Sequence, residues 1–425
     1  MKKIVILGAG FGGLRTAIIL SKKLRRLDIR EKYEIVLVDR NDHHTYTPLL
    51  YEVATTSKET ADLPTLHEVA AYKIDTILKH YPIRFTQGEI TAIDLIEGDL
   101  FLNKKHKITC DYVVLALGSE ANFFDIPGVR GNALSFKTFS DAIRIRNAVW
   151  NLALEGKNVI KILIGGGGPT GVELAGELKM WCGELEETFK KCRLNVTIIE
   201  AQPTILSSFG PKIISVAEKR LQKLAVKIIA PERIATAKKG SVVLQSGREV
   251  PYDVLVWTGG VKAPDILSRL PIQEELRNHV KVIGGMECLP QTSNLKLHAR
   301  IYAIGDNVCF YDPITKKAIP GVARAALSQA TIAAHNILED ILFEEKKVPR
   351  VRHTTYNPMD YPYIIPVGGK YAIAKIGPFV VSGFLGWILK GIVELNYLVS
   401  IMPFSQAIKT WLKGLKIFIK NDRLG

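Results

Sequence analysis

The chain has 425 residues, of which 47% are hydrophobic and 23% charged, and a formal net charge of +15. This balance excludes an intrinsically disordered chain, and the length predicts two or three domains rather than a single core. The basic excess suits an anionic surface, whereas five scattered cysteines without a C-x-x-C pair exclude a disulfide scaffold and are typical of reduced thiols.

The first predicted element is a buried strand that leads into a glycine-rich turn. The apolar run 4–7 is followed by Gly8, Gly10 and Gly13 in the G-x-G-x-x-G spacing. This spacing allows a tight turn, close approach of the backbone to a pyrophosphate, and close packing of the next helix. The N-terminus of that helix offers free N–H groups to a phosphate.

A second predicted strand, 34–38, ends in Asp39, an acid that can bind a ribose hydroxyl of an adenine nucleotide. We expect the polar segment that follows, residues 40–52, to lie over the bound nucleotide. Its adjacent His43 and His44 point in different directions, and no cysteine or carboxylate spacing supports them, so no metal site is expected.

The next segment predicts a helix, several short strands and a buried strand. Apolar residues at helical spacing predict one helix over residues 62–80, and short strands are expected near 84–85 and 90–93. The apolar run 112–117 predicts a buried strand that ends at Gly118. This strand brings the backbone of Ala116 and Gly118 near the first nucleotide site.

The whole pattern then repeats. After a strand at 161–164, Gly166, Gly168 and Gly171 restore the glycine spacing, and the strand 196–199 ends in Glu200. A further strand ends at Gly259 and Gly260, as the earlier one ends at Gly118. Two such units predict two adenine dinucleotides, most simply a flavin and a nicotinamide. Glu200 would bind a 2′-hydroxyl but repel a 2′-phosphate, which favours NADH over NADPH.

A third strand-to-acid element, residues 301–306, ends in Asp306, and a helix with a small-residue face is expected over 322–341. Asp306 can hydrogen-bond the ribityl or phosphate region of a flavin. The alternative is that this acid caps a helix N-terminus.

These motifs carry a family resemblance. The two glycine motifs and four further stretches resemble the type II NADH dehydrogenases, single-chain FAD-containing NADH:quinone oxidoreductases; the stretches are residues 47–50, 171–178, 256–264 and 303–306. The resemblance covers nearly the whole chain. It implies an α/β fold of glutathione-reductase type with two Rossmann-like dinucleotide-binding domains. The expected domains are an FAD domain of residues 1–120 and 263–335, an NADH domain of 121–262, and a C-terminal region of 336–425.

The resemblance also implies the binding residues. Those expected to bind FAD, which the family holds noncovalently, are Gly8, Gly10, Gly12, Gly13, Asp39, Arg40, Pro48, Leu49, Ala116, Gly118 and Asp306. Those expected to bind NADH are Gly166, Gly168, Gly171, Glu200, Gly259 and Gly260.

Glu173 stands at the motif position where the family has an acid near the nicotinamide and the flavin. That acid is implicated in coupling hydride transfer to proton transfer. The alternative is a first-turn acid that complements the helix dipole. The helix after Asp306 departs from the family pattern, because Arg324 and Ser328 stand where two glutamines are usual beside the quinone. A guanidinium can still donate to a quinone carbonyl, but it adds a fixed charge.

The C-terminal segment predicts a membrane-associating region. The apolar run 379–389 ends at Lys390, and Glu394 interrupts the next run, so both fall short of a bilayer span. From Phe404 a basic amphipathic helix with Trp411 on its apolar side is typical of an interfacial anchor. The same pattern can also dock on the protein's own core or on a second subunit, and family members often dimerise in this region.

We therefore expect a peripheral flavoenzyme on the cytoplasmic face of the cell membrane. It would pass a hydride from NADH to flavin N5, and then two electrons to a membrane quinone, without pumping protons. Three alternatives remain: a soluble NAD(P)H reductase with a ferredoxin-like acceptor or oxygen, a sulfide:quinone or disulfide reductase, and an NADH-sensing flavoprotein. No nucleic acid partner is expected.

Overall fold

The computed structural model describes residues 1–104, 106–319 and 321–421, and the chain divides into two compact units. The first unit comprises Met1–His44, Tyr72–Glu120 and Lys262–Tyr361. The second comprises Thr45–Ala71, Ala121–Val261 and the chain from Pro362 onward. Residues 45–71 thus group with the second unit, although they lie within the expected first domain.

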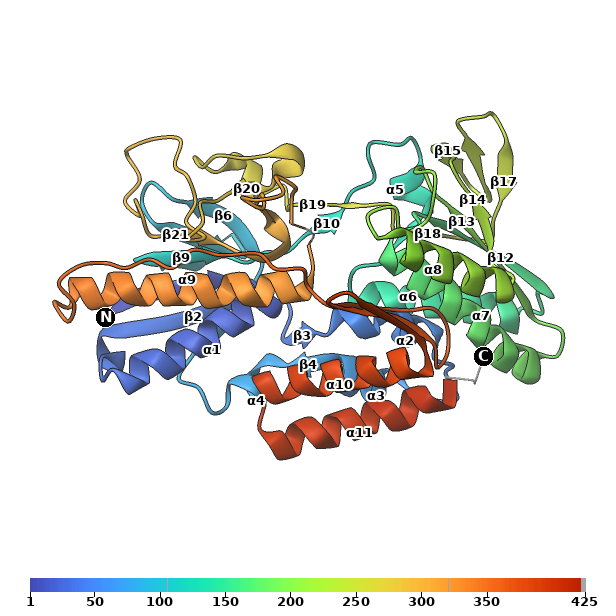
Figure 1. Cartoon of the computed structure of the whole chain (residues 1–425), viewed down its shortest axis with the longest axis horizontal. Coiled ribbons are helices and arrows are strands. Elements are labelled where there is room, and N and C mark those ends of the chain that lie inside the picture. The colour runs from blue at the N-terminus through green and yellow to red at the C-terminus, as the bar shows by residue number, and fades with distance from the viewer. Residues whose placement is uncertain (105, 320, 422–425) are drawn as a thin grey trace. The chain divides into compact units, whose positions relative to one another are not determined.

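The first unit is built on a five-stranded parallel sheet in the order β21-β9-β1-β2-β5. The strands are β1 (Lys2–Leu7), β2 (Tyr33–Asp39), β5 (Arg84–Gln87), β9 (Tyr112–Leu115) and β21 (Ile301–Ala303). The central strand β1 is apolar over 4–7 because it is buried on both faces. Helix α1 (Phe11–Arg26) packs along α9 (Ala323–Glu344), whose buried alanines allow a close approach (Figure 1).

Shorter elements complete the first unit. They are the antiparallel β6 (Ile90–Asp94), β7 (Asp99–Leu102) and β8 (His106–Thr109), the parallel pair β20 (Val280–Lys281) and β22 (Val308–Cys309), and helix α4 (Ile74–Leu78). The short strands β3 (His43–Thr45), β4 (Ala71–Lys73), β10 (Glu120–Ala121) and β19 (Val261–Lys262) lie where the chain passes from one unit to the other. The expected single helix over 62–80 is wrong, because β4 separates α3 (Leu63–Ala70) from α4.

The second unit repeats the parallel sheet in the order β11-β18-β12-β13-β14. Its strands are β11 (Leu134–Ser135), β12 (Val159–Gly165), β13 (Arg193–Ile199), β14 (Lys227–Ile229) and β18 (Val254–Trp257), and its helices include α5 (Val129–Asn132), α6 (Phe139–Leu154), α7 (Pro169–Phe189) and α8 (Pro211–Lys223). In both sheets the strand before the glycine turn is central, and the strand beside it leads to an acid, Asp39 at the end of β2 and Glu200 directly after β13. The expected internal repeat of a dinucleotide-binding fold is confirmed.

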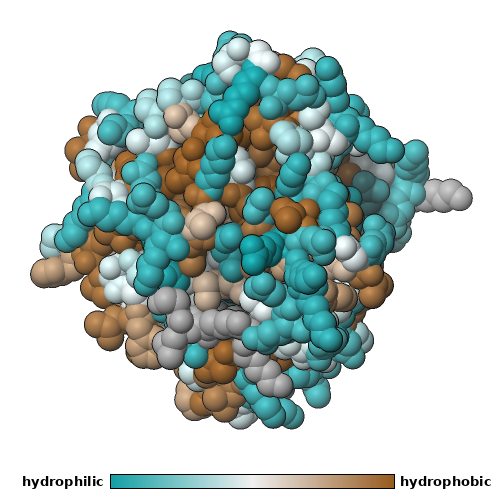
Figure 2. All heavy atoms as spheres, turned by 90° about the vertical axis from the view of Figure 1, so that its right-hand side faces the viewer, coloured by the Kyte–Doolittle hydropathy of each residue, from teal (hydrophilic) through white to brown (hydrophobic). Residues whose placement is uncertain are grey.

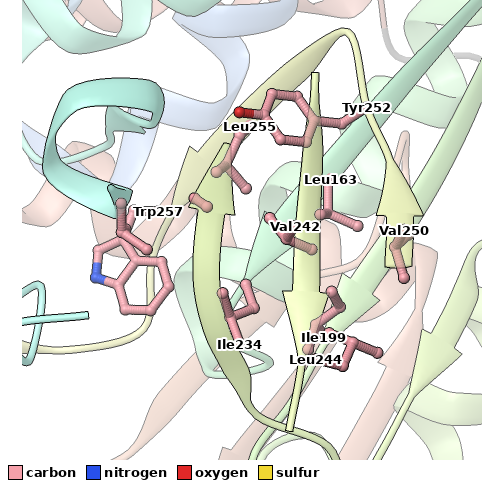
Figure 3. Close-up of a cluster of buried hydrophobic side chains, with 11 residues drawn as sticks. Leu163, Ile199, Ile234, Val242, Leu244, Val250, Tyr252, Leu255 and Trp257 are labelled. Carbon is pink, nitrogen blue, oxygen red and sulfur yellow. The ribbon is translucent and has the colours of Figure 1, made fainter. Parts of the chain in front are cut away.

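A buried cluster joins this parallel sheet to an antiparallel one (Figure 3). The antiparallel strands are β15 (Ile234–Lys238), β16 (Ser241–Leu244) and β17 (Glu249–Pro251). Leu163 and Ile199 contribute from the parallel sheet, and Val242 and Leu244 from the antiparallel one. Trp257 completes the cluster and donates from its indole N–H to the carbonyl of Asn122 at 2.7 Å.

The C-terminal part of the second unit is a small sheet followed by two helices. The antiparallel strands are β23 (Tyr363–Pro366), β24 (Ala372–Ile376) and β25 (Phe379–Gly383), and the helices are α10 (Phe384–Ile401) and α11 (Phe404–Asn421). Helix α10 packs on this sheet and on α11. Within the described ranges, α10 alone has the length and composition to cross a membrane, and Lys390 and Glu394 interrupt its apolar sequence as expected.

The two C-terminal helices leave large apolar side chains in solvent. Those of α10 are Phe384, Leu385, Ile388, Ile392, Val393 and Val399, and those of α11 are Phe404, Leu412 and Ile419. The inner face of α10 instead carries Lys390, which is partly buried, and Glu394, which is buried. Figure 2 shows one face of the molecule, on which hydrophobic side chains lie between hydrophilic ones.

Candidate functional site

The first glycine turn follows β1. Gly8 adopts a φ of +105°, and a side chain there would clash with the carbonyl of Ala116 on the neighbouring strand end. A side chain on Gly13 would clash with the carbonyl of Gly8, whereas one on Gly10 would meet open space. Gly8 and Gly13 are therefore required by the fold, and Gly10 leaves room for a ligand.

Asp39 is hydrogen-bonded to the first glycine turn. Its carboxylate accepts hydrogen bonds from the backbone N–H of Ala9 at 2.7 Å and of Asn41 at 2.9 Å. The acid therefore lies beside the glycine turn at the carboxyl end of the sheet, where nucleotides bind to such folds. Arg40 follows it with an exposed side chain, while Gly12 is buried against Ile304.

His44 is a residue of this region that the sequence analysis did not assign. Its ring is buried, and its Nδ1–H donates to the carbonyl of Ala9 at 2.8 Å. Burial lowers the pKa of His44 to about 4, so the ring is neutral at neutral pH. Phe11 and Tyr72 flank it, with ring centroids 5.1 and 6.5 Å away. His44 thus stabilises the glycine turn through its hydrogen bond to the carbonyl of Ala9.

A second group of polar residues lies at the end of β21. Asp306 accepts a hydrogen bond from the Ser119 hydroxyl at 3.0 Å, and the Asn307 side chain accepts one from the N–H of Gly118 at 3.2 Å. The helix-cap alternative for Asp306 is wrong, because the N-cap residue of α9 is Val322. The predicted Gly118 and Asp306 are brought together, and Ala116 and Gly118 flank the same strand end.

Helix α9 carries the two residues that depart from the family pattern. Arg324 is exposed in its first turn and Ser328 is partly buried one turn later. The neighbouring Gln329, which the sequence analysis missed, is buried and accepts a hydrogen bond from the N–H of Gly305 at 2.7 Å. Gln329 directly follows Ser328, which stands where the family usually has a glutamine, so the sequence did contain a sign that Gln329 belongs to this region.

The second unit repeats the glycine turn between β12 and α7. Gly166 has a φ of +116°, and a side chain there would clash with Gly259. A side chain on Gly171 would clash with the carbonyl of Gly166, whereas one on Gly168 would meet open space. The Thr258 hydroxyl, which the sequence analysis did not assign, donates to the carbonyl of Gly166 at 2.9 Å.

Glu200 occupies the position that Asp39 holds in the first unit. Its carboxylate accepts from the N–H of Gly167 at 2.6 Å and of Gln202 at 2.7 Å. Gly260 lies next to Gly259, and a side chain on it would meet the ring of Phe124. The predicted NADH-binding residues therefore gather at one edge of the second sheet.

Glu173 lies on α7, which begins at Pro169. The first turn of this helix holds no acid, so the alternative that Glu173 is a first-turn dipole acid is wrong. Desolvation raises the pKa of Glu173 to about 8, and the positive charge of Lys390 opposes this shift. By contrast, Glu177 is buried and accepts a hydrogen bond from the N–H of Gly369 at 3.2 Å, which is a structural role.

The stretch with Pro48 and Leu49 forms a short 3₁₀ turn, Thr47–Leu49, that leads into α2 (Leu50–Thr55). Leu49 is buried and Pro48 is exposed. Both residues belong to the second unit, and their contact with FAD stays a prediction.

Two dinucleotide-binding units in one chain are typical of an oxidoreductase that uses two nucleotides. The family described as pyridine nucleotide-disulphide oxidoreductase matches residues 2–330. The chain belongs to this family, whose members are FAD-dependent. The expected α/β fold with two Rossmann-like domains is confirmed.

The comparisons also confirm the resemblance to type II NADH dehydrogenases. The chain is 27% identical over 448 residues to "Type II NADH:quinone oxidoreductase Ndh" of Mycobacterium tuberculosis, covering 99% of this chain and 89% of that one. It is similar in fold to NDH2 from Plasmodium falciparum in complex with NADH, with a TM-score of 0.82 and 18% identity over 100% and 99% of the chains. The sulfide:quinone oxidoreductase from Aquifex aeolicus gives a TM-score of 0.75 at 19% identity, over 99% and 96%.

Proposed function

We propose that the protein is a non-proton-pumping, FAD-dependent NADH:quinone oxidoreductase. The observation that carries this proposal is the pair of glycine turns, each with a middle glycine facing open space and an acid closing the turn. Such a turn fits the pyrophosphate and ribose of an adenine dinucleotide. Two turns fit one flavin and one nicotinamide dinucleotide.

The first turn fits FAD. The open space at Gly10 and the carboxylate of Asp39 suit its pyrophosphate and ribose, and Asp306 and the N–H of Gly118 lie at the adjoining strand ends. The remaining proposed FAD contacts are Gly8, Gly12, Gly13, Arg40, Pro48, Leu49 and Ala116. Bound there, FAD would supply a hydride acceptor for NADH and a two-electron donor for a quinone.

The second turn is proposed to bind NADH rather than NADPH. Gly166, Gly168, Gly171, Gly259 and Gly260 supply the backbone, and the Glu200 carboxylate faces the same edge of the sheet. A carboxylate accepts hydrogen bonds from a 2′-hydroxyl and repels a 2′-phosphate. We propose that Glu173, which holds a proton at neutral pH, is the catalytic acid of this site.

The proposed domain assignment is residues 1–120 with 263–335 for FAD, 121–262 for NADH, and 336–425 for membrane association or dimerisation. Residues 422–425 lie outside the part of the chain that the structure describes. Arg324 and Ser328 are the proposed quinone-site residues. An exposed guanidinium can donate to a quinone carbonyl.

The C-terminal helices support attachment to a lipid surface. Helix α10 turns Lys390 and Glu394 inward and leaves Leu385, Ile388 and Ile392 in solvent, whereas an ordinary surface helix has a charged or polar outer face. An apolar outer face beside lysines of α11 is typical of a helix lying in the membrane interface. We propose that the protein is peripheral and lies on the cytoplasmic face of the membrane, where such lysines meet anionic lipid. The apolar outer face of α10 could also form the interface of a homodimer.

The test is steady-state NADH oxidation by the purified, FAD-loaded protein with a short-chain quinone, under anaerobic conditions. We expect turnover that depends on the quinone and is much slower with NADPH. Turnover with a ferredoxin-type acceptor or oxygen, but none with quinone, would replace the proposal by a soluble reductase.

A sulfide:quinone or disulfide reductase is disfavoured by the cysteines. All five thiols are free, and burial raises the pKa of Cys110 to about 12 and also raises that of Cys309. A redox thiol normally has a lowered pKa, because the thiolate is the reactive form.

A further inference from the structure

The segment 122–125 holds two consecutive residues in a backbone conformation that L-residues rarely adopt. Phe124 has a φ of +51° and Asp125 a φ of +53°. For a bulky residue such as phenylalanine, a positive φ is a strained outlier, because its Cβ crowds the backbone. Strain of this kind persists only where the surrounding structure imposes it, and it is frequent at ligand sites. The surroundings of Phe124 in the second unit indicate what this strain achieves.

Three hydrogen bonds fix the segment to the end of β18. The indole N–H of Trp257 donates to the carbonyl of Asn122 at 2.7 Å, and the N–H of Asn122 donates to the carbonyl of Gly260 at 3.0 Å. The Asn122 side chain accepts a further bond from the N–H of Phe124 at 2.9 Å. Phe124 is thus held at the strand end that carries Gly259 and Gly260, two of the proposed NADH-binding residues.

The strained backbone places the Phe124 ring on Gly260. A side chain on Gly260 would lie 2.8 and 3.0 Å from two carbons of this ring, so the ring fills the space beside the glycine. The neighbouring Phe123 is partly buried, with its ring centroid 6.3 Å from that of Trp257, whereas Phe124 is 43% exposed. Packing on the core therefore accounts for Phe123 but leaves much of the Phe124 ring uncovered.

The equivalent position of the first unit is different. Gly118 is the third residue after β9, as Gly260 is the third after β18. A side chain on Gly118 would meet open space, and the N–H of Gly118 donates to the Asn307 side chain. The aromatic contact therefore distinguishes the second unit, which is proposed to bind the nicotinamide nucleotide, from the first.

The order of the strands indicates which half of the nucleotide would reach Phe124. Glu200, directly after β13, lies where the adenine ribose binds to such folds, and the glycine turn after β12 lies where the pyrophosphate binds. Strand β18 is on the opposite side of β12 from β13. A dinucleotide that crosses the sheet end in this direction extends from its pyrophosphate towards β18 with its nicotinamide half.

We propose that the strained conformation of Phe124 holds its ring against the nicotinamide half of the coenzyme and so orients the planar nicotinamide ring. This inference rests on the proposed function, because it takes a nicotinamide dinucleotide as the ligand of the second glycine turn. Contact between two planar rings contributes affinity beyond the area that it buries. Since hydrogen bonds to Asn122 fix the segment without a ligand, binding would cost little conformational entropy there.

The test is isothermal titration calorimetry of the full-length, FAD-loaded protein with two ligands, NAD+ and ADP-ribose. ADP-ribose has the adenine, the pyrophosphate and both riboses of NAD+ but lacks the nicotinamide ring. Phe124→Leu should raise the dissociation constant of NAD+ by about tenfold and change that of ADP-ribose by less than about twofold. Phe124→Tyr retains an aromatic ring and should bind both ligands as the natural protein does.

Asp125→Asn is the matched control, because asparagine tolerates the same positive φ and the change leaves the ring in place. It should alter neither dissociation constant. If Asp125→Asn weakened NAD+ binding as much as Phe124→Leu does, the backbone of the segment would be responsible rather than the ring, and the inference would fail. Equal losses for both ligands in Phe124→Leu, or no loss for NAD+, would also overturn it.

The outcomes separate this inference from the proposed function. If the natural protein bound both ligands and Phe124→Leu caused no selective loss, the role of Phe124 would be removed and the nucleotide site would stand. If the natural protein bound neither ligand, the proposed NADH site would be removed, and this inference with it.

Discussion

The carboxylate of Glu200 accepts a hydrogen bond from the backbone N–H of Gly167 at 2.6 Å. Glu200 directly follows β13 and Gly167 lies inside the glycine turn, so the bond places the carboxylate at the nucleotide-binding end of the sheet. Asp39 and Ala9 make the corresponding bond in the first unit. In both units, therefore, an acidic side chain accepts a hydrogen bond from a backbone N–H of the glycine turn.

This bond leads to a prediction about coenzyme choice. Glu200→Gln keeps an acceptor for the Gly167 N–H but removes the charge, so NADPH affinity should rise relative to NADH by about tenfold. Dissociation constants for both nucleotides, from flavin or tryptophan fluorescence, measure the change. Glu249→Gln, which removes an exposed acid of β17, should leave the ratio unaltered. An unchanged ratio in Glu200→Gln would remove this residue from the site.

The glycines of the first turn should respond differently to alanine. Gly10→Ala meets open space within the protein, so the chain should fold but bind FAD at least about tenfold more weakly. Gly13→Ala would clash with the Gly8 carbonyl and should destabilise the fold itself. Flavin content and thermal unfolding of the two variants separate these effects. Full FAD binding by Gly10→Ala would show that the pyrophosphate does not approach there.

His44 should make stability depend on pH. Its pKa is lowered from 6.5 to about 4, so between these values the unfolded chain binds a proton that the folded chain does not. Stability should therefore fall as the pH falls from 6.5 to 4, by about 3 kcal/mol in total. Denaturant unfolding at a series of pH values measures this slope.

His44→Leu should lose the contact to Ala9 but flatten the slope, whereas His106→Leu, at an exposed position of β8, should not. A slope that persists in His44→Leu would assign the effect to another group.

The outer face of α10 should determine lipid binding. Exchanging Leu385 and Ile392 together for serine removes apolar area from this face, so sedimentation with anionic vesicles should drop by about tenfold or more. Leu276→Ser, at a residue that is 82% exposed in the first unit, is the matched control. Equal losses in both variants would indicate a general change in solubility rather than a lipid-binding face.

The nucleotide-binding turns could be predicted from sequence because their determinants are local. The positions of Gly8 and Gly166 require positive φ, and the apolar runs before them are buried on both faces. The helix expected over 62–80 failed because Ala71 and Tyr72 are buried in β4, where apolar periodicity alone does not distinguish strand from helix.

The ion pair of Lys390 with Glu52 could not be predicted, because the two residues are distant in the chain. Glu52 and Lys390 are separated by 338 residues, and in sequence Lys390 and Glu394 only interrupt an apolar run. Their inward orientation depends on the packing of α10 against the sheet and α11. Glu173 was assigned by family resemblance, while its raised pKa depends on burial that the sequence does not reveal.

The most direct measurement of the central claim is an anaerobic stopped-flow experiment on the FAD-loaded protein in two steps. Mixing with one equivalent of NADH should bleach the flavin absorbance rapidly, and mixing with NADPH should bleach it slowly. Subsequent mixing with a short-chain quinone should restore the absorbance without oxygen. Rapid bleaching followed by no recovery with quinone would contradict the account, and would leave a protein with both nucleotide sites but a different electron acceptor.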